Sequence, residues 1–409
     1  MFAILARESA AALGMPQLAV ATVPHPLGGL DPRVMNAKAE DVFEKVTALL
    51  TTTPSAPAAG VGRPSPIMKA PDDLDEFQEF VMAEEWGDGL PALPSTPARV
   101  DRILGACASR RHEVVATLAP RMAEATIEAI ATNAALTGAG PEHLPVIVAA
   151  LRAMTKPEFN LQGIQTTTHP CGPLLIVNGP MAKRLGVASG ANALGGGSRA
   201  NAVIGRSVRL ALMNVGGARP GTVDRATLGH PGKYAYCVAE NEEASPWEPL
   251  HVERGFQADE SCVTVAAAEG PHNVNDHGST TADGFLCALA GTAATTGCNN
   301  IYYRGGQPLV GLGPEHARTV ADSGWSKRDL KRAFWERARV AIRRFNPENL
   351  VRFAAIDPDR FLDAPPDREV ELCGTPDDLI VFVAGGPGKH SVIIPTFGAT
   401  RCVTMRIDT

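Results

Sequence analysis

The sequence predicts an α/β protein in which a helical region is followed by a mixed sheet. Apolar strands repeatedly end at a Gly-Pro pair, and proline suits the first residue of a helix because its missing N–H has no intrahelical partner there. The likeness of PLLIVNGPMAKRLG to PLVGLGPEHARTVADSG also hints at two related halves. The strand-GlyPro junctions are LLIVNGP (174–180), VTVAAAEGP (263–271), PLVGLGP (308–314) and LIVFVAGGP (379–387).

The N-terminal residues predict an incomplete α/β unit followed by a linker. We expect a helix over 2–13, a strand over 18–23, a turn and a helix over 31–50. A strand–helix pair without partner strands cannot cover its own faces, so residues 1–53 need the later chain or another subunit. Residues 54–71 are rich in Pro, Ala, Ser and Gly, a composition typical of a linker.

The remaining chain divides into a mainly helical region, 72–160, and an α/β region, 161–409, which we expect to be catalytic. Apolar residues at helical spacing, with breaks at Pro or Gly, define the helices of the first region. In the second region Pro180 and Ser198 are both placed to start helices. The helices expected in the first region cover 72–83, a segment from 96, 123–136 and 144–154.

Composition excludes several classes of protein. A net charge of −6 argues against a nucleic-acid surface, which needs clustered Lys and Arg. No apolar run approaches the roughly 18 residues of a membrane span, and no secretory signal is recognisable. The eight cysteines include no CxxC pair, so neither a zinc ribbon nor a disulfide framework is expected. We therefore expect a cytoplasmic protein with reduced thiols.

Two polar residues precede the first strand of the α/β region. His169 and Cys171 lie just before the apolar run 174–177. They predict an imidazole–thiolate pair if the intervening Pro170 turn places both on one face. The alternative is that Cys171 is a buried and inert cysteine.

A glycine run leads into the predicted helix that follows. Such a loop presents free backbone N–H groups and the positive end of the helix dipole, which suits an anionic substrate. A tight turn packed against a helix explains the same sequence. The candidate anion-binding residues are Gly195, Gly196, Gly197, Ser198, Arg199 and Asn201.

A further glycine-rich turn, GGPGKHS, lies at 385–391. It lacks the GxxxxGK[ST] spacing and is followed by a β-like run, and the run at 195–197 lacks GxGxxG. No nucleotide cofactor is therefore predicted. Lys389 and the backbone amides of the turn remain a candidate anion site.

Glu240 and His251 are the first candidates for acid–base chemistry. Glu240 follows the predicted strand 234–239, and a carboxylate at a strand end beside a histidine predicts a general acid–base pair. The neighbouring Glu242 and Glu243 are expected to be exposed, because consecutive glutamates usually form a charged surface loop. A surface loop would also account for the whole group.

His272, Asp276 and His277 form the second group, in EGPHNVNDHGST. Two histidines and an aspartate after a strand could relay protons or bind a divalent metal. His272 and His277 are the candidate metal ligands, although no HxH or HExxH spacing is present. The alternative is a tight turn in which these side chains satisfy backbone groups.

The segment ALGMPQLAVATVPHPLGGL, with the helix after it, resembles the tail of the UGSC-type (seleno)protein family. Members carry a Cys/Sec-Gly-Ser-Cys motif in the half of the domain that precedes this tail, and they are often called thiol–disulfide-type proteins. This sequence contains no CGSC, so the redox motif is not carried over. The resemblance implies either a separate small subunit with the CGSC or UGSC motif, or a fragment kept for assembly.

Residues 84–409 resemble a second, poorly characterised bacterial family that is similar to proteins encoded beside UGSC-type partners. This resemblance implies a two-component enzyme without naming a substrate. The motifs that carry it are EWGDGLPALP (85–94), FNLQGIQTTTHP (159–170), LLIVNGP (174–180), GKYAYCVAENEEASPWEPLHVERGF (232–256), EGPHNVNDHGST (269–280) and GPEHARTVADSGWSK (313–327).

Three functions are consistent with these observations. The first is a lyase- or oxidoreductase-type enzyme, or the large subunit of one, that cleaves or reduces a carbon–heteroatom bond of a small anionic substrate by acid–base chemistry, with a partner thiol in one version. The second is a divalent-metal-dependent hydratase or hydrolase. The third is a non-catalytic subunit that binds a small redox partner through residues 1–53. A homo- or hetero-oligomer is expected in each case.

Overall fold

A computed structural model of the chain describes residues 3, 6–7, 10, 15, 17–24, 31–51 and 67–408. The predicted helix over 2–13 falls largely outside these residues, as do the turn at 25–29 and residues 54–66 of the predicted linker. The predicted strand over 18–23 is wrong, because those residues pair with no other strand. The helix that follows is confirmed as α2 (Pro32–Thr51).

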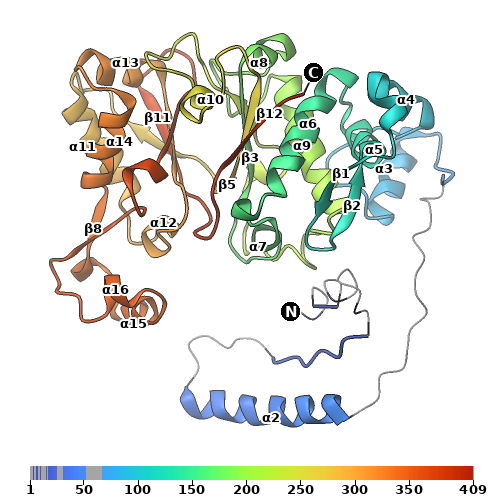
Figure 1. The fold of residues 1–409 in the computed structure, drawn as a ribbon, viewed down its shortest axis with the longest axis horizontal. Coiled ribbons are helices and arrows are strands. Elements are labelled where there is room, and N and C mark those ends of the chain that lie inside the picture. The colour runs from blue at the N-terminus through green and yellow to red at the C-terminus, as the bar shows by residue number, and fades with distance from the viewer. Residues whose placement is uncertain are drawn as a thin grey trace.

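The α/β prediction is confirmed (Figure 1). The helices of the main body are α3 (Leu74–Ala83), α4 (Pro97–Leu104), α5 (Ile127–Thr137), α6 (Leu144–Met154), α7 (Leu161–Gln165), α8 (Pro180–Leu185), α9 (Arg199–Asn214), α10 (Leu250–Glu253), α11 (Ala282–Ala293), α12 (Asn299–Tyr302), α13 (Pro314–Asp322), α14 (Lys327–Arg337), α15 (Pro347–Ile356) and α16 (Pro358–Phe361). No helix among the described residues is both long and apolar enough to cross a membrane.

The strands form two four-stranded sheets and two two-stranded sheets rather than one sheet. The first sheet has the order β12-β5-β3-β4 and the second the order β10-β7-β11-β6. The strands are β1 (Val114–Leu118), β2 (Ala123–Thr126), β3 (Gly172–Asn178), β4 (Cys237–Ala239), β5 (Cys262–Ala268), β6 (His272–Asn275), β7 (Leu309–Leu312), β8 (Arg339–Ala341), β9 (Glu369–Glu371), β10 (Ile380–Val383), β11 (His390–Ile394) and β12 (Val403–Arg406).

The two sheets stack face to face between two layers of helices. Successive side chains of a strand point to opposite faces, so Leu175 packs into the core with α5, α6 and α9 while Ile176 faces the second sheet. In the second sheet Phe382 faces the first sheet, whereas Val310 and Leu312 pack into the core with α11, α13 and α14. The order of layers is therefore helices, sheet, sheet, helices (Figure 1).

The two sheets have the same internal arrangement, as expected for related halves. In each sheet one parallel pair, β3–β4 or β7–β10, is followed by two antiparallel neighbours. The second half also repeats the spacing of identical residues in the first. Leu309, Gly313, Pro314, Arg318, Ser323 and Gly324 correspond in this way to Leu175, Gly179, Pro180, Arg184, Ser189 and Gly190.

Each half gives one strand to the sheet of the other. The chain leaves β5 in the first sheet and forms β6 beside β11 of the second. It leaves β11 in the second sheet and forms β12 beside β5 of the first. Neither four-stranded sheet is therefore built by one half alone.

Two of the four Gly-Pro junctions lead into helices, and two do not. Pro180 and Pro314 are the first residues of α8 and α13, as predicted. The helix expected after 263–271 is wrong, since that turn leads into β6. The junction at 379–387 likewise turns back into the antiparallel β11. Proline permits a helix start but does not require one, because the same fixed φ also suits a turn.

The helical region holds most of its predicted helices and one hairpin. Helix α3 begins after the cap Asp73, α4 begins after the cap Thr96, and α6 has the predicted limits. The helix expected over 123–136 is wrong for its first four residues, which form β2 opposite β1. Helices of this region and the first sheet share one core, so residue 160 does not separate two units of packing.

We predict that Gly179→Ala destabilises the fold much more than Gly186→Ala. Both residues have positive φ angles, 81° and 66°. A Cβ at Gly179 would meet the Glu260 carbonyl oxygen and lie 2.9 Å from Ser261 Cα, whereas a Cβ at Gly186 meets nothing within 4 Å. Strain alone should cost about 1 kcal/mol at Gly186, and strain with overlap about 3 kcal/mol or more at Gly179. Equal losses in chemical denaturation would contradict this packing.

Candidate functional site

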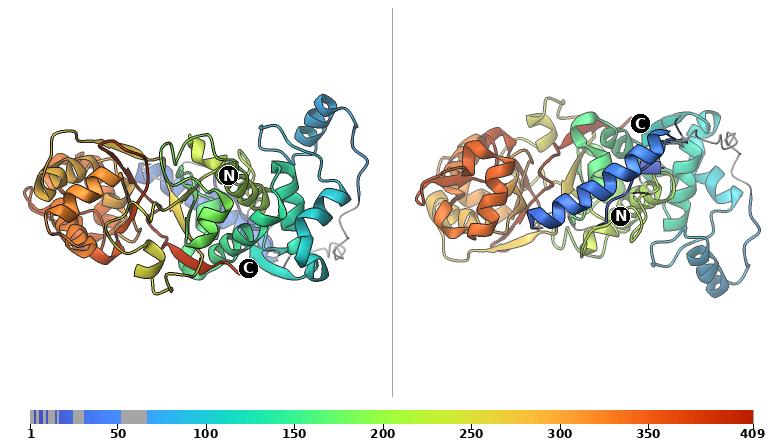
Figure 2. Two further views of the ribbon diagram at one scale, coloured as in Figure 1. Left: turned by 90° about the horizontal axis from the view of Figure 1, so that it is seen from above. Right: turned by 90° about the horizontal axis from the view of Figure 1, so that it is seen from below.

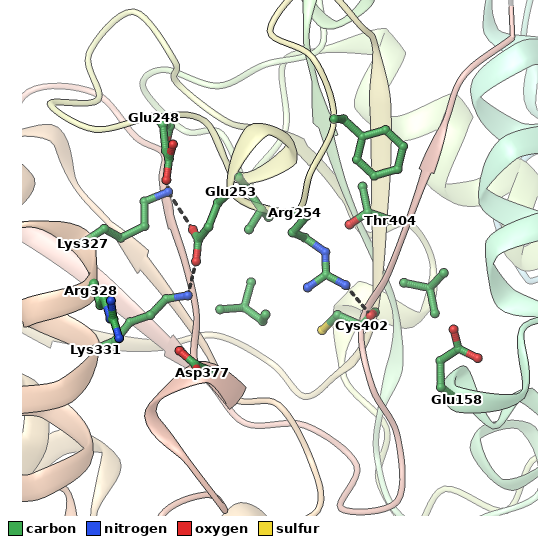
Figure 3. A pocket seen from close by; sticks show the side chains of 14 residues that line it. Glu158, Glu248, Glu253, Arg254, Lys327, Arg328, Lys331, Asp377, Cys402 and Thr404 are labelled. Carbon is green, nitrogen blue, oxygen red and sulfur yellow. Dashed lines mark hydrogen bonds and ion pairs between the residues drawn. The ribbon is translucent and has the colours of Figure 1, made fainter.

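A cavity of about 580 Å³ lies between the two halves (Figure 3). Its walls come from α10, the start of β12, the N-terminal part of α14 and the first residue of β10. The polar side chains that line it are Glu158, Glu248, Glu253, Arg254, Lys327, Arg328, Lys331, Asp377 and Thr404, together with Cys402.

Two buried lysines on α14 share one carboxylate in this cavity. Lys327 and Lys331 are each only 6% exposed and lie one helical turn apart. Lys331 Nζ donates to Glu253 Oε1, and Lys327 Nζ forms an ion pair 3.0 Å from Oε2, outside hydrogen-bond geometry. Lys327 Nζ also donates to the carbonyl oxygen of Glu248 at 2.8 Å. The innermost charges are thus two ammonium groups and one carboxylate.

The local sequence fixes the direction of both lysines. Ser326 caps α14 by accepting from the Asp329 amide at 3.1 Å, and the Asp329 carboxylate accepts from the Ser326 amide at 3.1 Å. This reciprocal capping makes Ser326 the N-cap and Lys327 the first residue of the helix. Trp247 fastens the opposite wall by donating from Nε1 to the Trp325 carbonyl at 3.1 Å.

Arg254 adds a third positive group. Its Nη2 donates to the carbonyl oxygen of Cys402 at 2.8 Å, while its Nε is buried without a hydrogen-bond partner. At the inner end of the cavity, Arg254 and the two lysines place three positive charges beside the one negative charge of Glu253. Burying an unbalanced charge is costly, so an anion in this space would be bound favourably.

Burial and nearby charge act on the ionisable groups of this region in opposite directions. Burial would raise the pKa of Glu253, but Lys327 and Lys331 together lower it below its usual value. Glu253 is therefore an anion at neutral pH. Burial raises the pKa of the Cys402 thiol to about 11, which keeps that thiol protonated.

Glu240 is buried beside the cavity and not inside it. Its carboxylate accepts from Asn178 Nδ2 and from the Leu250 amide, each at 2.7 Å, and so connects β3 to α10. Burial raises the pKa of Glu240, and Lys327 partly offsets that rise. The sequence correctly singled out this carboxylate as unusual, but its partners give it a structural role.

The predicted Glu240–His251 pair does not form. His251 is fully buried, neither ring nitrogen has a hydrogen-bond partner, and its Nδ1 lies 3.9 Å from Glu242 Oε1. The expectation that Glu242 is exposed is also wrong, because its carboxylate accepts from the Gly179 amide at 2.8 Å. Glu243 is exposed as expected and pairs with Lys183.

The second predicted group follows β6 without forming a metal centre. His272 begins the strand and His277 follows its end, so about 10 Å or more of strand separates the two imidazoles. Asp276 Oδ1 accepts from the Gly278 and Ser279 amides at 3.1 and 3.0 Å, as the tight-turn alternative requires. Within the described residues, no group of three or more His, Cys, Asp or Glu is placed to hold a metal.

His169 and Cys171 are neighbours but not an imidazole–thiolate pair. His169 Nε2 lies 2.8 Å from Glu269 Oε1, and its Nδ1 accepts from the Cys171 amide at 3.3 Å. Burial raises the pKa of the Cys171 thiol to about 12, so it stays protonated. The inert alternative fits this cysteine, and the carboxylate partner Glu269 was not predicted.

The glycine run leads into a helix as predicted, but none of its residues lines the cavity. Ser198 caps α9, and the Arg199 guanidinium donates to the Gly138 carbonyl oxygen at the end of α5. Asn201 is buried and donates to the carbonyl oxygen of Cys237 at 2.9 Å. Arg199 and Asn201 therefore hold the fold together. This corrects the anion site expected at Gly195, Gly196, Gly197, Ser198, Arg199 and Asn201.

Sequence reasoning missed the residues that line the cavity. Lys327, Arg328 and Lys331 lie in a basic amphipathic helix whose charges would normally face solvent. The sequence gave little indication of their role, because only the fold shows that the lysine-bearing face of α14 covers the junction between the halves. Glu253 and Arg254 lie inside the motif 232–256, two and three residues after His251, and their charges gave no reason to prefer them.

The comparisons with known proteins concern the other end of the chain. Residues 1–52 match the model of the UGSC family. No curated protein matches the chain. The match supports the resemblance drawn for the N-terminal segment, while the second resemblance, over 84–409, stays a prediction. The matched segment includes α2 and none of the residues that line the cavity.

We predict that Glu253→Gln lowers the free energy of unfolding by about 3 kcal/mol or more, because two buried lysines lose their only shared carboxylate. The control is Glu336→Gln at an exposed position of α14, the helix that carries both lysines, and it should change stability little. Because the folded pKa of Glu253 is lowered, its contribution is complete above the normal carboxyl range and disappears as pH falls below it. A Glu253→Gln variant as stable and as acid-sensitive as the control would contradict the proposed ion-pair geometry.

Proposed function

We propose that this protein is an enzyme that binds a small anionic substrate in the cavity between its halves and acts on it by acid–base chemistry. The observation that supports this most is the positive charge at the inner end of the cavity, where the buried Lys327 and Lys331 and the half-buried Arg254 face Glu253. The other acidic lining residues, Glu158, Glu248 and Asp377, are exposed. A carboxylate or phosphate group of the substrate would balance this charge. The volume, about 580 Å³, suits a metabolite-sized molecule.

The same groups suit a lyase reaction at a carbon–heteroatom bond. Glu253 would accept the proton of the carbon next to the leaving group, and the electrons of that C–H bond would form the new double bond. The heteroatom would leave with its bonding pair and take a proton from Lys331. The remaining cations would stabilise the negative charge that develops on the substrate. The reductive version needs two further electrons, and only a partner dithiol outside this chain would supply them.

We expect Lys331→Met to weaken binding of a small dicarboxylate such as succinate by about tenfold or more, because one charge-assisted hydrogen bond is lost. Lys327 still balances Glu253 in this variant. Isothermal titration of the wild type and of the exposed-lysine control Lys156→Met should give equal affinities. If Lys331→Met and the control bind succinate and phosphate equally well, the cavity is not the anion site.

A second role, binding of a partner through the N-terminal segment, is favoured by α2. No residue of this 20-residue helix is buried, and it lies apart from the sheets (Figures 1 and 2). Phe43 is 72% and Leu50 82% exposed, and Val46 adds to the same apolar stripe. A helix with such a stripe is expected to bury it against another chain. We therefore propose that residues 1–53 dock a partner subunit.

Removing residues 1–66 should leave the stability of the remaining chain unchanged within about 0.5 kcal/mol, because α2 buries nothing against it. The truncated protein should form assemblies with fewer subunits than the full-length chain does. In the full chain, Phe43→Ser with Leu50→Ser should also lower the number of subunits, and Glu40→Gln on the same helix should not. The same number of subunits in all these proteins would remove the case for docking.

A further inference from the structure

We infer that a second cavity, at the carboxyl ends of β7 and β10, binds the carboxylate of a small acid with an apolar body. This cavity has a volume of about 620 Å³ and shares no lining residue with the first. One wall is the N-terminal part of α13 and the turn after β10. The other consists of segments that follow α8 and β4 in the first half.

The first half shows what the corresponding turn binds. There, Gly179 and Pro180 lead from β3 into α8, and the carboxylate of Glu242 occupies the junction. Glu242 Oε1 accepts from the Gly179 amide and from Asn178 Nδ2, both at 2.8 Å. A carboxylate supplied by the protein itself therefore fills this position between the ends of two parallel strands.

In the second half the same position has no carboxylate. The strand register pairs Val177 with Ala239 in the first half and the corresponding Gly311 with Phe382 in the second. Counting on from these pairs, Gly385 stands where the first half has Glu242. The Gly313 amide, which corresponds to the Gly179 amide, donates instead to Ser391 Oγ at 3.1 Å, so this turn carries no carboxylate.

Two basic residues line this cavity. Arg318 is exposed on α13, one turn after Pro314, and none of the hydrogen bonds and ion pairs found for the described residues involves its side chain. Lys389 Nζ donates to the Ser279 carbonyl oxygen at 2.9 Å and lines the cavity. The acidic lining residue Glu315 is occupied, since its Oε1 accepts from the Gly388 amide at 2.7 Å. The local charge thus favours an anion.

The rest of the lining is mainly apolar, which defines the body of the ligand. Ala191 and Ala244 come from the first half, and Pro314 and Pro387 from the second. A phosphate-like ligand would leave these surfaces in contact with water. A monocarboxylate with a short hydrocarbon chain would satisfy the cations and the apolar walls together. Lys389 is thus the one predicted anion-binding residue that lines a cavity.

Titration with monocarboxylates of increasing length, from acetate to hexanoate, tests this site. We expect affinity to rise about fourfold for each CH₂ that becomes buried. Arg318→Gln, which removes none of the hydrogen bonds and ion pairs found for the described residues, should weaken hexanoate binding about tenfold, and Lys389→Gln should weaken it as well. The exposed-arginine control Arg352→Gln should bind like the wild type.

Lys331→Met should also bind hexanoate like the wild type, because Lys331 belongs to the first cavity. This comparison separates failure of the second site from failure of the proposed function. Affinity that does not increase with chain length, inorganic phosphate binding as tightly as hexanoate, or full affinity in Arg318→Gln would each overturn the inference.

Discussion

The fold depends on the point where β5 and β11 extend past their own sheets and cross. Beyond the strands, Ala268 bridges Thr396, the Glu269 amide donates to the Pro395 carbonyl at 2.8 Å, and the Phe397 amide donates to the Ala267 carbonyl at 3.0 Å. After this crossing each chain segment continues into the opposite sheet as β6 or β12. A half that unfolded would remove an edge strand from the other half as well. The crossing therefore makes the two sheets one cooperative unit and fixes the space between them.

Both cavities are consequences of this constraint. The apolar layer between the sheets is filled by side chains such as Ile176 and Phe382, but it ends where the sheets diverge. At one edge of this layer the lysines of α14 line the first cavity, and at the other edge the turn at Gly385 lines the second cavity. Buried ion pairs seldom add net stability, because desolvation offsets their attraction. The Lys327–Glu253–Lys331 group is therefore better explained by binding than by folding.

The sequence revealed local structure well and the sites poorly, for a physical reason. Helix starts at Pro180, Pro314 and Ser198 depend on neighbouring residues alone, so their signals are readable in the chain. The exchange of β6 and β12 between the sheets determines which loops lie close together, and no local sequence pattern predicts this exchange. The glycine run was a sound helix start but is capped by its own Ser198. Lys389, which lines the second cavity, could be named as a candidate from the sequence because a glycine turn beside a basic residue is a local feature.

The difference between the halves is as informative as their likeness. An internal carboxylate at a helix start satisfies amides permanently, and Glu242 does so in the first half. Replacing that side chain by a glycine turn in the second half leaves the cations Arg318 and Lys389 without an internal carboxylate at the corresponding position. The Gly313 amide donates to Ser391 Oγ instead, so in the second half the amide is satisfied while the two cations have no internal counter-charge at this turn. A ligand carboxylate in the cavity would supply that counter-charge, which is the role that we infer for it.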